Sequence, residues 1–293
     1  MRFALNPISA GLLLSYRCSS ECGHCMYACS PKWTADWISE DILERILLRL
    51  SRTLKSCPGR LGIDCGLHFT GGEPFLNVKL LVRASDLARK AGIRSTFVET
   101  NCLFCSDDAK TEETLVQLKR AGLEGILISV NPFVAGEVPF ERTERAVRVS
   151  RDIFGPNAIV YQDIFYQELR ALDLKGTLPL EDYLKKAPYG LGFAELLPMG
   201  RAVYRLGHLF RAFPARYFFG QSCREELLRE WHVHIDNYGN YVPGYCAGIS
   251  LGNWLEADEV DLEGVPVVDA LVRHGVKGLY EICLLYTSDA ADE

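Results

Sequence analysis

Short runs of apolar residues alternate with longer amphipathic stretches along most of the chain. The first four runs are GLLLSY (11–16), GLHFTGG (66–72), IRSTFVET (93–100) and GILISV (125–130). Runs this short that are rich in apolar, β-branched or aromatic residues are typical of buried strands. Two further runs predict a fifth and a sixth strand, at AIVYQDIFY (158–166) and GFAELLPM (192–199).

The stretches between these runs carry apolar residues at helical spacing. They predict helices over 39–54, 78–92, 107–122 and 140–155, and a short one at LEDYLKKA (180–187). Ser39 stands at the start of the first of these helices and is followed by acidic residues, which predicts that it is the N-cap. Gly92 and Gly122 are the expected stop signals of the second and third.

Six strands that alternate with helices predict an α/β fold with a parallel sheet, either open and doubly wound or closed toward a barrel. In such folds the chemistry gathers at the carboxyl ends of the strands. Clusters of polar residues do follow the expected strands here. Four cysteines follow the first expected strand, and TGGE lies at the end of the second strand. ETN ends the third strand and SVN ends the fourth.

The pattern changes after about residue 200. An aromatic and basic stretch is followed by WHVHIDNYGNYVPGYC, which predicts a hairpin with its turn at DNYGN. We therefore expect a core domain over residues 1–205 and an appendage over 206–282. The last segment, CLLYTSDAADE (283–293), matches a reading frame of a sequencing-library adapter. We expect it to be read-through, which makes the chain a fragment and leaves Cys283 without function.

Composition narrows the class of protein. The net charge of -6 argues against a nucleic-acid-binding surface, which needs clustered Lys and Arg. No apolar run reaches the roughly 20 residues that cross a membrane, and no cleavable export signal is expected at the start. Eleven cysteines without an export signal indicate metal or redox chemistry in the cytoplasm rather than disulfides.

The stretch CSSECGHCMYAC holds Cys18, Cys22, Cys25 and Cys29. Four thiolates could close around one Fe–S cluster, because the spacing is close to that of ferredoxins, and the protein would then be an electron carrier. A four-cysteine zinc site fits less well, since such sites usually combine two distant pairs. Three thiolates on a cluster would instead leave one iron open for chemistry.

Joined to Gly71, Gly72 and Glu73 in FTGGEPF, the Cys-x3-Cys-x2-Cys spacing resembles the radical S-adenosylmethionine (SAM) superfamily. The resemblance covers about residues 11–200. It implies a partial, six-stranded parallel βα barrel and a 4Fe–4S cluster on Cys18, Cys22 and Cys25. SAM would bind the open iron, and its reductive cleavage would give a 5′-deoxyadenosyl radical that abstracts hydrogen from a substrate. Cys29 should then lie off the cluster.

The resemblance also implies a SAM site at the other strand ends. Gly71, Gly72 and Glu73 would hold the amino group, while the remaining expected contacts are His24, Thr100, Asn101, Ser129 and Asn131. His24 stands where an aromatic residue near the adenine is usual. Asn131 replaces a more common acidic residue, and Cys102 a more common glycine.

The appendage resembles the SPASM or twitch extension of this superfamily, in which cysteines hold an auxiliary Fe–S cluster. Cys223 and Cys246 are the candidate ligands. Cys102 and Cys105 follow the third strand, where they would ligate metal, act as a redox pair or thiol donor, or be two loop thiols without function. The resemblance implies an external electron donor of flavodoxin or ferredoxin type. The substrate is not readable from the sequence, and a peptide or protein is the candidate class.

Overall fold

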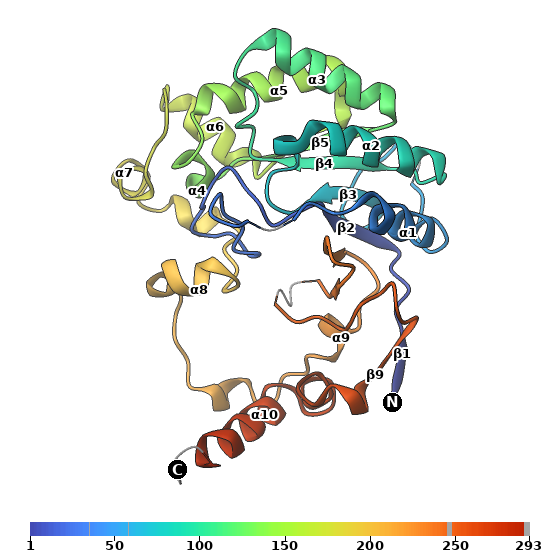
Figure 1. Ribbon diagram of the computed structural model, residues 1–293. Coiled ribbons are helices and arrows are strands. Elements are labelled where there is room, and N and C mark those ends of the chain that lie inside the picture. Colours follow the sequence, from blue (N-terminus) through green and yellow to red (C-terminus); the bar gives the residue numbers. More distant parts are fainter. Residues whose placement is uncertain (35, 58, 245–247, 290–293) are drawn as a thin grey trace.

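The computed structural model of the chain describes residues 1–34, 36–57, 59–244 and 248–289, with side chains as far as residue 284. A seven-stranded sheet organises the molecule (Figure 1). Its strands, in sheet order, are β6 (Ala158–Tyr161), β5 (Gly125–Ser129), β4 (Thr96–Thr100), β3 (Gly66–Thr70), β2 (Ser9–Leu13), β7 (Val233–Ile235) and β8 (Tyr241–Val242).

Six of these strands are parallel, and only β8 runs antiparallel, to β7. The predicted α/β class and the parallel sheet are confirmed. The sheet stays open, because β6 and β8 are its two edges in the part of the chain that the structure describes. A separate antiparallel pair joins β1 (Arg2–Ala4) to β9 (Glu259–Asp261).

Four long helices cover one face of the sheet (Figure 1). They are α1 (Glu40–Leu50), α2 (Val78–Lys90), α3 (Asp108–Ala121) and α5 (Phe140–Phe154). Side chains alternate between the faces of a strand, so every second residue of the sheet meets these helices. Leu12, Phe69, Val98 and Ile126 do so, and all four are fully buried in the main core.

The predicted helix signals act as expected. The Ser39 hydroxyl accepts a hydrogen bond from the Ile42 amide (3.3 Å) and caps α1. Gly122 follows α3 in the left-handed conformation (φ 117°), which a glycine adopts without steric cost.

Shorter elements complete the chain. The remaining α-helices are α4 (Pro132–Ala135), α6 (Asp163–Ala171), α7 (Leu180–Lys186), α8 (Arg201–Arg205), α9 (Arg224–Leu227) and α10 (Pro266–Asp289), the last kinked at Gly275. The 3-10 helices are η1 (Pro74–Asn77), η2 (Gly155–Asn157), η3 (Gly190–Phe193), η4 (Gly207–Leu209), η5 (Ala215–Phe218) and η6 (Leu262–Gly264).

Two predicted strands differ from the structure. The fifth ends at Tyr161, and the rest of its apolar run forms α6, because Phe165, Tyr166 and Leu169 bury one side of a helix. The predicted sixth strand, 192–199, does not form. Pro198 lacks the amide that a strand interior needs, and Phe193 is largely exposed.

β7 supplies the sixth parallel strand instead, and it adds to the other side of the sheet, next to β2. This strand belongs to the segment expected to form the appendage. Residues 206–282 therefore contribute to the main sheet through β7 and β8, while the division near residue 205 stays a prediction.

Candidate active site

The cysteine loop, residues 17–30, leaves the carboxyl end of β2 and returns beside its own start. Arg17 and Ser30 form an isolated bridge, and the Cys18 amide donates to the Ser30 carbonyl (3.2 Å). Inside the loop the Cys25 amide donates to the carbonyl of Cys22 (3.2 Å). A short loop closed in this way holds its thiols at one end of the sheet.

The four cysteines of the loop differ in burial. Cys18, Cys22 and Cys25 are half-buried, whereas Cys29 is 1% exposed. The Cys29 amide donates to the Cys25 sulfur (3.3 Å). A hydrogen bond from the Cys29 thiol lowers the pKa of Cys25 and raises that of Cys29, while burial raises the pKa of Cys18 to about 12.

Glu73 connects the ends of two strands, β3 and β4. One carboxylate oxygen accepts from the Phe75 amide (3.1 Å) and the Thr100 hydroxyl (3.0 Å), and the other accepts from the Asn101 amide (2.9 Å). Burial raises the pKa of Glu73 to about 7, although these hydrogen bonds oppose the shift. Residues at the ends of β3 and β4 are thereby fixed to one another.

Asn101 continues this connection into the cysteine loop. Its side-chain nitrogen donates to the Ser19 hydroxyl (3.0 Å) and the Ser20 hydroxyl (3.3 Å) and lies 3.9 Å from the Cys18 sulfur. The structure thus brings the Cys18 end of the loop, Glu73 and Asn101 together, as the strand-end pattern predicted.

Gly71 and Gly72 are required by packing within the chain. A Cβ at Gly72 would lie 1.8 Å from the carbonyl oxygen of Arg17, and one at Gly71 would lie 2.4 Å from that of Ser15. Gly71 also has a φ of 117°. The Gly72 amide donates to the Ser15 carbonyl (2.8 Å). The two glycines let the end of β3 lie directly against the entry to the cysteine loop.

His24 and Asn131 meet on the other side of the loop. The Asn131 side-chain nitrogen lies 3.1 Å from Nε2 of His24, and the imidazole stacks on Phe133 with ring centres 4.9 Å apart. The Asn131 side-chain oxygen caps α4 through the amides of Phe133 and Val134. Burial lowers the pKa of His24 to about 4. Ser129 is half-buried at the end of β5, two residues before Asn131.

Arg201 holds the loop from outside the sheet, a contact that the sequence did not predict. Its guanidinium donates to the carbonyls of Cys22 (2.9 Å), Ala28 (2.8 Å) and Cys29 (2.6 Å). Gly200 precedes it with a φ of 53°, and a Cβ there would lie 2.2 Å from the Met26 carbonyl oxygen. The segment around Gly200 and Arg201 therefore packs on the cysteine loop.

The remaining predicted cysteines are not part of the cysteine loop, although the Cys102 amide donates to the Thr100 hydroxyl (3.0 Å). Cys102 and Cys105 are fully buried in the main core, and burial raises the pKa of both. Cys102 has a φ of 70°, which explains why glycine would suit that position. Cys223 occupies the N-cap position of α9 without a capping hydrogen bond from its side chain, and Cys246 lies outside the described residues.

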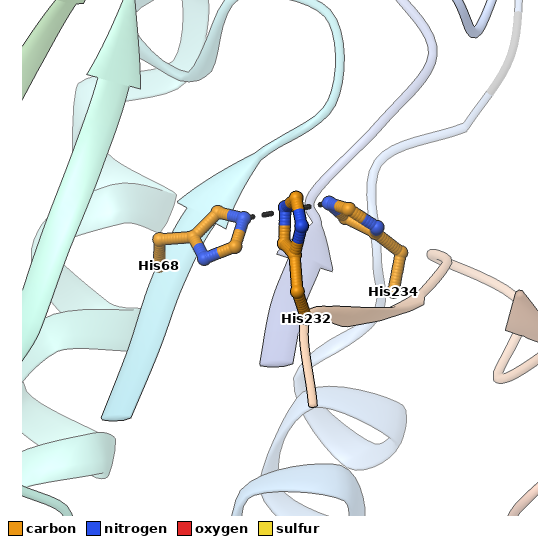
Figure 2. Close-up of side chains that lie close together, drawn as sticks. All are labelled: His68, His232 and His234. Carbon is orange, nitrogen blue, oxygen red and sulfur yellow. Dashed lines mark hydrogen bonds between the residues drawn. The ribbon is translucent and has the colours of Figure 1, made fainter. Parts of the chain in front are cut away.

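Three histidines that the sequence analysis did not single out converge on the sheet face opposite the long helices (Figure 2). His68 lies on β3, His234 on β7 and His232 just before β7. One nitrogen from each lies within 4.8 Å of the others. Burial lowers the pKa of His68 to about 3 and that of His232 to about 4, so the rings are neutral at pH 7.

A cavity of about 390 Å³ lies at the amino ends of the strands, next to the start of β5. Its lining includes Arg89, Lys119 and Asn157. It is distant in the fold from the cysteine loop, so it does not enlarge the candidate site. Among the described residues, no helix is long and apolar enough to cross a membrane.

Comparison with known proteins gives structural likeness only. No family model matches the chain, and no curated protein matches it significantly. Among solved structures, BtrN in complex with AdoMet and 2-DOIA is 14% identical, with a TM-score of 0.48 over 86% of this chain and 80% of that one.

A second similar structure is native anSMEcpe with bound AdoMet, at 15% identity and a TM-score of 0.47 over 85% of this chain and 79% of that one. The same protein with AdoMet and the Kp18Cys peptide has a TM-score of 0.46 at 15% identity, over 85% and 78%. Likeness of this degree does not establish a shared activity.

Proposed function

We propose that this chain is a radical SAM enzyme that binds a 4Fe–4S cluster through Cys18, Cys22 and Cys25. The proposal rests on the resemblance of the cysteine and GGE motifs and on their arrangement in the fold. The observation that carries it is Asn101, whose side chain binds the cysteine loop while its amide binds Glu73. The two motifs, in which Cys25 and Glu73 are 48 residues apart in sequence, are thereby held next to each other, which supports a single site.

The donor set fits the cluster. Three half-buried thiols on one closed loop can act as thiolate ligands, which Fe–S clusters require. The fourth thiol, Cys29, is buried against Cys25. The bound cluster would supply the electron for reductive cleavage of SAM and thereby for hydrogen abstraction from a substrate.

The chain's own residues would hold the thiols in position and bind SAM. Arg201 and the Glu73–Asn101 connection hold the loop from two sides and keep the three thiols in place. His24 is neutral and stacked, so its ring offers an uncharged flat surface beside Asn131. We assign the SAM contacts to His24, Asn131 and Ser129, and to the strand ends at Gly71, Gly72, Glu73, Thr100 and Asn101.

In this proposal a flavodoxin- or ferredoxin-type protein donates the electron, and the substrate belongs to the peptide or protein class. Cys223 and Cys246 remain the candidate ligands of an auxiliary cluster. The loop cysteines Cys18, Cys22, Cys25 and Cys29 form no disulfide, which suits a reducing cytoplasm.

The test is anaerobic turnover of the reconstituted protein with dithionite and SAM, measured as 5′-deoxyadenosine released. Cys22→Ala should abolish release, because it removes a cluster ligand. Cys29→Ala should retain both the iron content and the release. Cys65→Ala, which removes another buried thiol, is the matched control.

A different result would identify an electron carrier. If Cys29→Ala loses iron as Cys22→Ala does, and the cluster's EPR signal does not respond to SAM, all four thiols of the loop are ligands. The enzyme proposal then fails.

A further inference from the structure

His68, His232 and His234 point toward one another from two strands that lie on either side of β2 (Figure 2). Their ring centres are 5.1 to 5.8 Å apart. His68 and His234 are 2% and 4% exposed. Buried polar side chains cluster in this way when they share a partner or hold a ligand.

The spacing of two of the nitrogens matches a coordination shell. Nε2 of His68 lies 3.4 Å from Nε2 of His234. Two imidazoles bound to one tetrahedral ion at about 2.0–2.1 Å have their nitrogens about 3.3–3.4 Å apart. The same distance fits a hydrogen bond between two neutral rings. The surroundings of the rings must therefore decide between metal coordination and a hydrogen bond.

A hydrogen bond between the rings leaves polar groups unsatisfied. Nδ1 of His234 is buried and has no hydrogen-bond partner among the described residues. The ring of Tyr27 is edge-on to that of His234, with ring centres 5.3 Å apart. The Tyr27 hydroxyl is also buried and has no hydrogen-bond partner among the described residues. Buried polar groups in folded proteins are normally satisfied, so these atoms indicate that the site holds a further polar partner, such as an ion or a water, beyond the histidine pair.

A carboxylate lies beside His68, on the neighbouring strand. Oε1 of Glu99, on β4, is 3.6 Å from Nε2 of His68, and its other oxygen accepts from the Thr70 hydroxyl (2.7 Å). Three imidazoles and one carboxylate are a ligand set for zinc, ferrous iron or another first-row transition ion. Magnesium and calcium prefer oxygen ligands alone. Glu99 also supplies the negative charge that a buried divalent ion requires.

The backbone is arranged to let the imidazoles meet. Gly11, on β2 between the two histidine-bearing strands, has no side chain. A Cβ there would lie 2.4 Å from Nε2 of His68 and 2.4 Å from Cδ2 of His234. His232 has a φ of 49°, a backbone conformation that is uncommon for residues other than glycine. Its amide is held by the Ser9 hydroxyl (2.7 Å).

We propose that His68, His232 and His234, together with the Glu99 carboxylate, bind one divalent transition-metal ion. The site is separate from the cysteine loop and uses none of its thiols. Tyr27, which belongs to that loop, contacts His234, so the ion would lie beside the loop on the sheet face opposite the long helices. The inference does not depend on the radical SAM proposal.

The test uses Co²⁺ as the probe, added anaerobically to the full chain carrying Cys18→Ser, Cys22→Ser and Cys25→Ser. This background removes the thiols of the proposed cluster. We expect one equivalent of Co²⁺ with visible d–d absorption and no thiolate-to-cobalt charge transfer. Zn²⁺ should displace it, and the X-ray absorption of the zinc form should show nitrogen and oxygen neighbours with the outer-shell pattern of imidazole.

Two variants and one matched control locate the ion. His68→Gln with His234→Gln should weaken Co²⁺ binding by about 100-fold or more, because two ligands are lost. Gly11→Ala keeps every ligand but should also weaken binding, because the new methyl group fills the space where the rings meet. His208→Gln with His274→Gln removes two exposed imidazoles and should leave the affinity unchanged.

The outcomes that overturn the proposal are separate from a folding failure. No visible Co²⁺ spectrum in the background that lacks Cys18, Cys22 and Cys25, or sulfur in the first shell of the zinc form, would each contradict it without any histidine variant. Equal loss of binding in the His208 and His274 control would contradict it too. Loss of SAM cleavage alone would bear on the proposed function and not on this site.

Discussion

The guanidinium of Arg201 donates a hydrogen bond to the carbonyl oxygen of Cys22, 179 residues earlier in the chain (2.9 Å). Two further hydrogen bonds from the same group reach Ala28 and Cys29. The conformation of the cysteine loop is therefore held by hydrogen bonds from Arg201 as well as by hydrogen bonds within the loop.

Arg201→Ala should loosen the loop. Hydrogen bonds from a charged donor contribute about 1.5–3 kcal/mol each, and because the guanidinium is half-exposed we expect a total loss of only about 2 kcal/mol. Hydrogen exchange of the Cys25 and Ala28 amides should become faster. Arg205→Ala, at an exposed position on the same helix, is the control and should not change these rates. Unchanged protection in Arg201→Ala would show that the loop closes without the guanidinium.

Gly72→Ala should destabilise the whole chain. The new Cβ would overlap the carbonyl oxygen of Arg17, and backbone at this position has little room to move. We expect the free energy of unfolding to fall by about 3 kcal/mol, at the upper end of overpacking effects. Gly192→Ala adds the same atom where nothing lies within 4 Å. In urea denaturation, equal midpoints for the two variants would contradict the prediction.

Glu73 should make stability depend on pH. Burial raises its pKa from 4.5 to about 7 in the folded chain, so between these values the folded state keeps a proton that the unfolded state releases. The free energy of unfolding should fall as pH rises through this window. The stabilisation is complete below about pH 4.5 and lost above about pH 7, a change of about 3 kcal/mol.

The measurement is the free energy of unfolding of the wild-type chain relative to Glu73→Gln, at intervals between pH 4.5 and 7.5. Glutamine does not titrate, so the difference isolates this carboxyl. Parallel profiles for the two chains would mean that Glu73 is ionised throughout.

The Cys25 thiol should be the most reactive of the loop in the absence of a cluster. The hydrogen bond from Cys29 lowers its pKa, and a larger thiolate fraction speeds alkylation. Cys29→Ala removes the donor, raises the pKa of Cys25 and should slow its alkylation by iodoacetamide at pH 7 about tenfold. Peptide mapping by mass spectrometry follows the site, and Cys65→Ala should leave the rate as it was.

Local patterns predicted the parts of the fold that local interactions determine. The helix capped by Ser39 and the four strands β2 to β5 follow from apolar spacing and from capping residues. The strand predicted over residues 158–166 was wrong over its second half. Its apolar residues suit either periodicity there, and burial of Phe165 and Leu169 on one helical face decided the outcome.

The rest depended on contacts between distant segments. Nothing near residues 233–235 indicates that they pair with β2, and without that pairing His234 could not meet His68. The two signals that were available are a histidine inside the apolar run GLHFT and the alternating HVH at 232–234. Both indicate a polar side chain on a buried strand face, but neither identifies its partner.

The pairing of β2 with β7 also sets an order of events during folding. His232 and Ser9, which meet beside this pairing, are separated by 223 positions. Contacts that close so long a loop form late, because their entropy cost comes before any compensating contact is made. On the ribosome the first five parallel strands emerge well before the sixth, so β2 has an open edge for much of synthesis. Convergence of the three imidazoles therefore marks the completion of the sheet, and a probe bound there would report only fully folded chains.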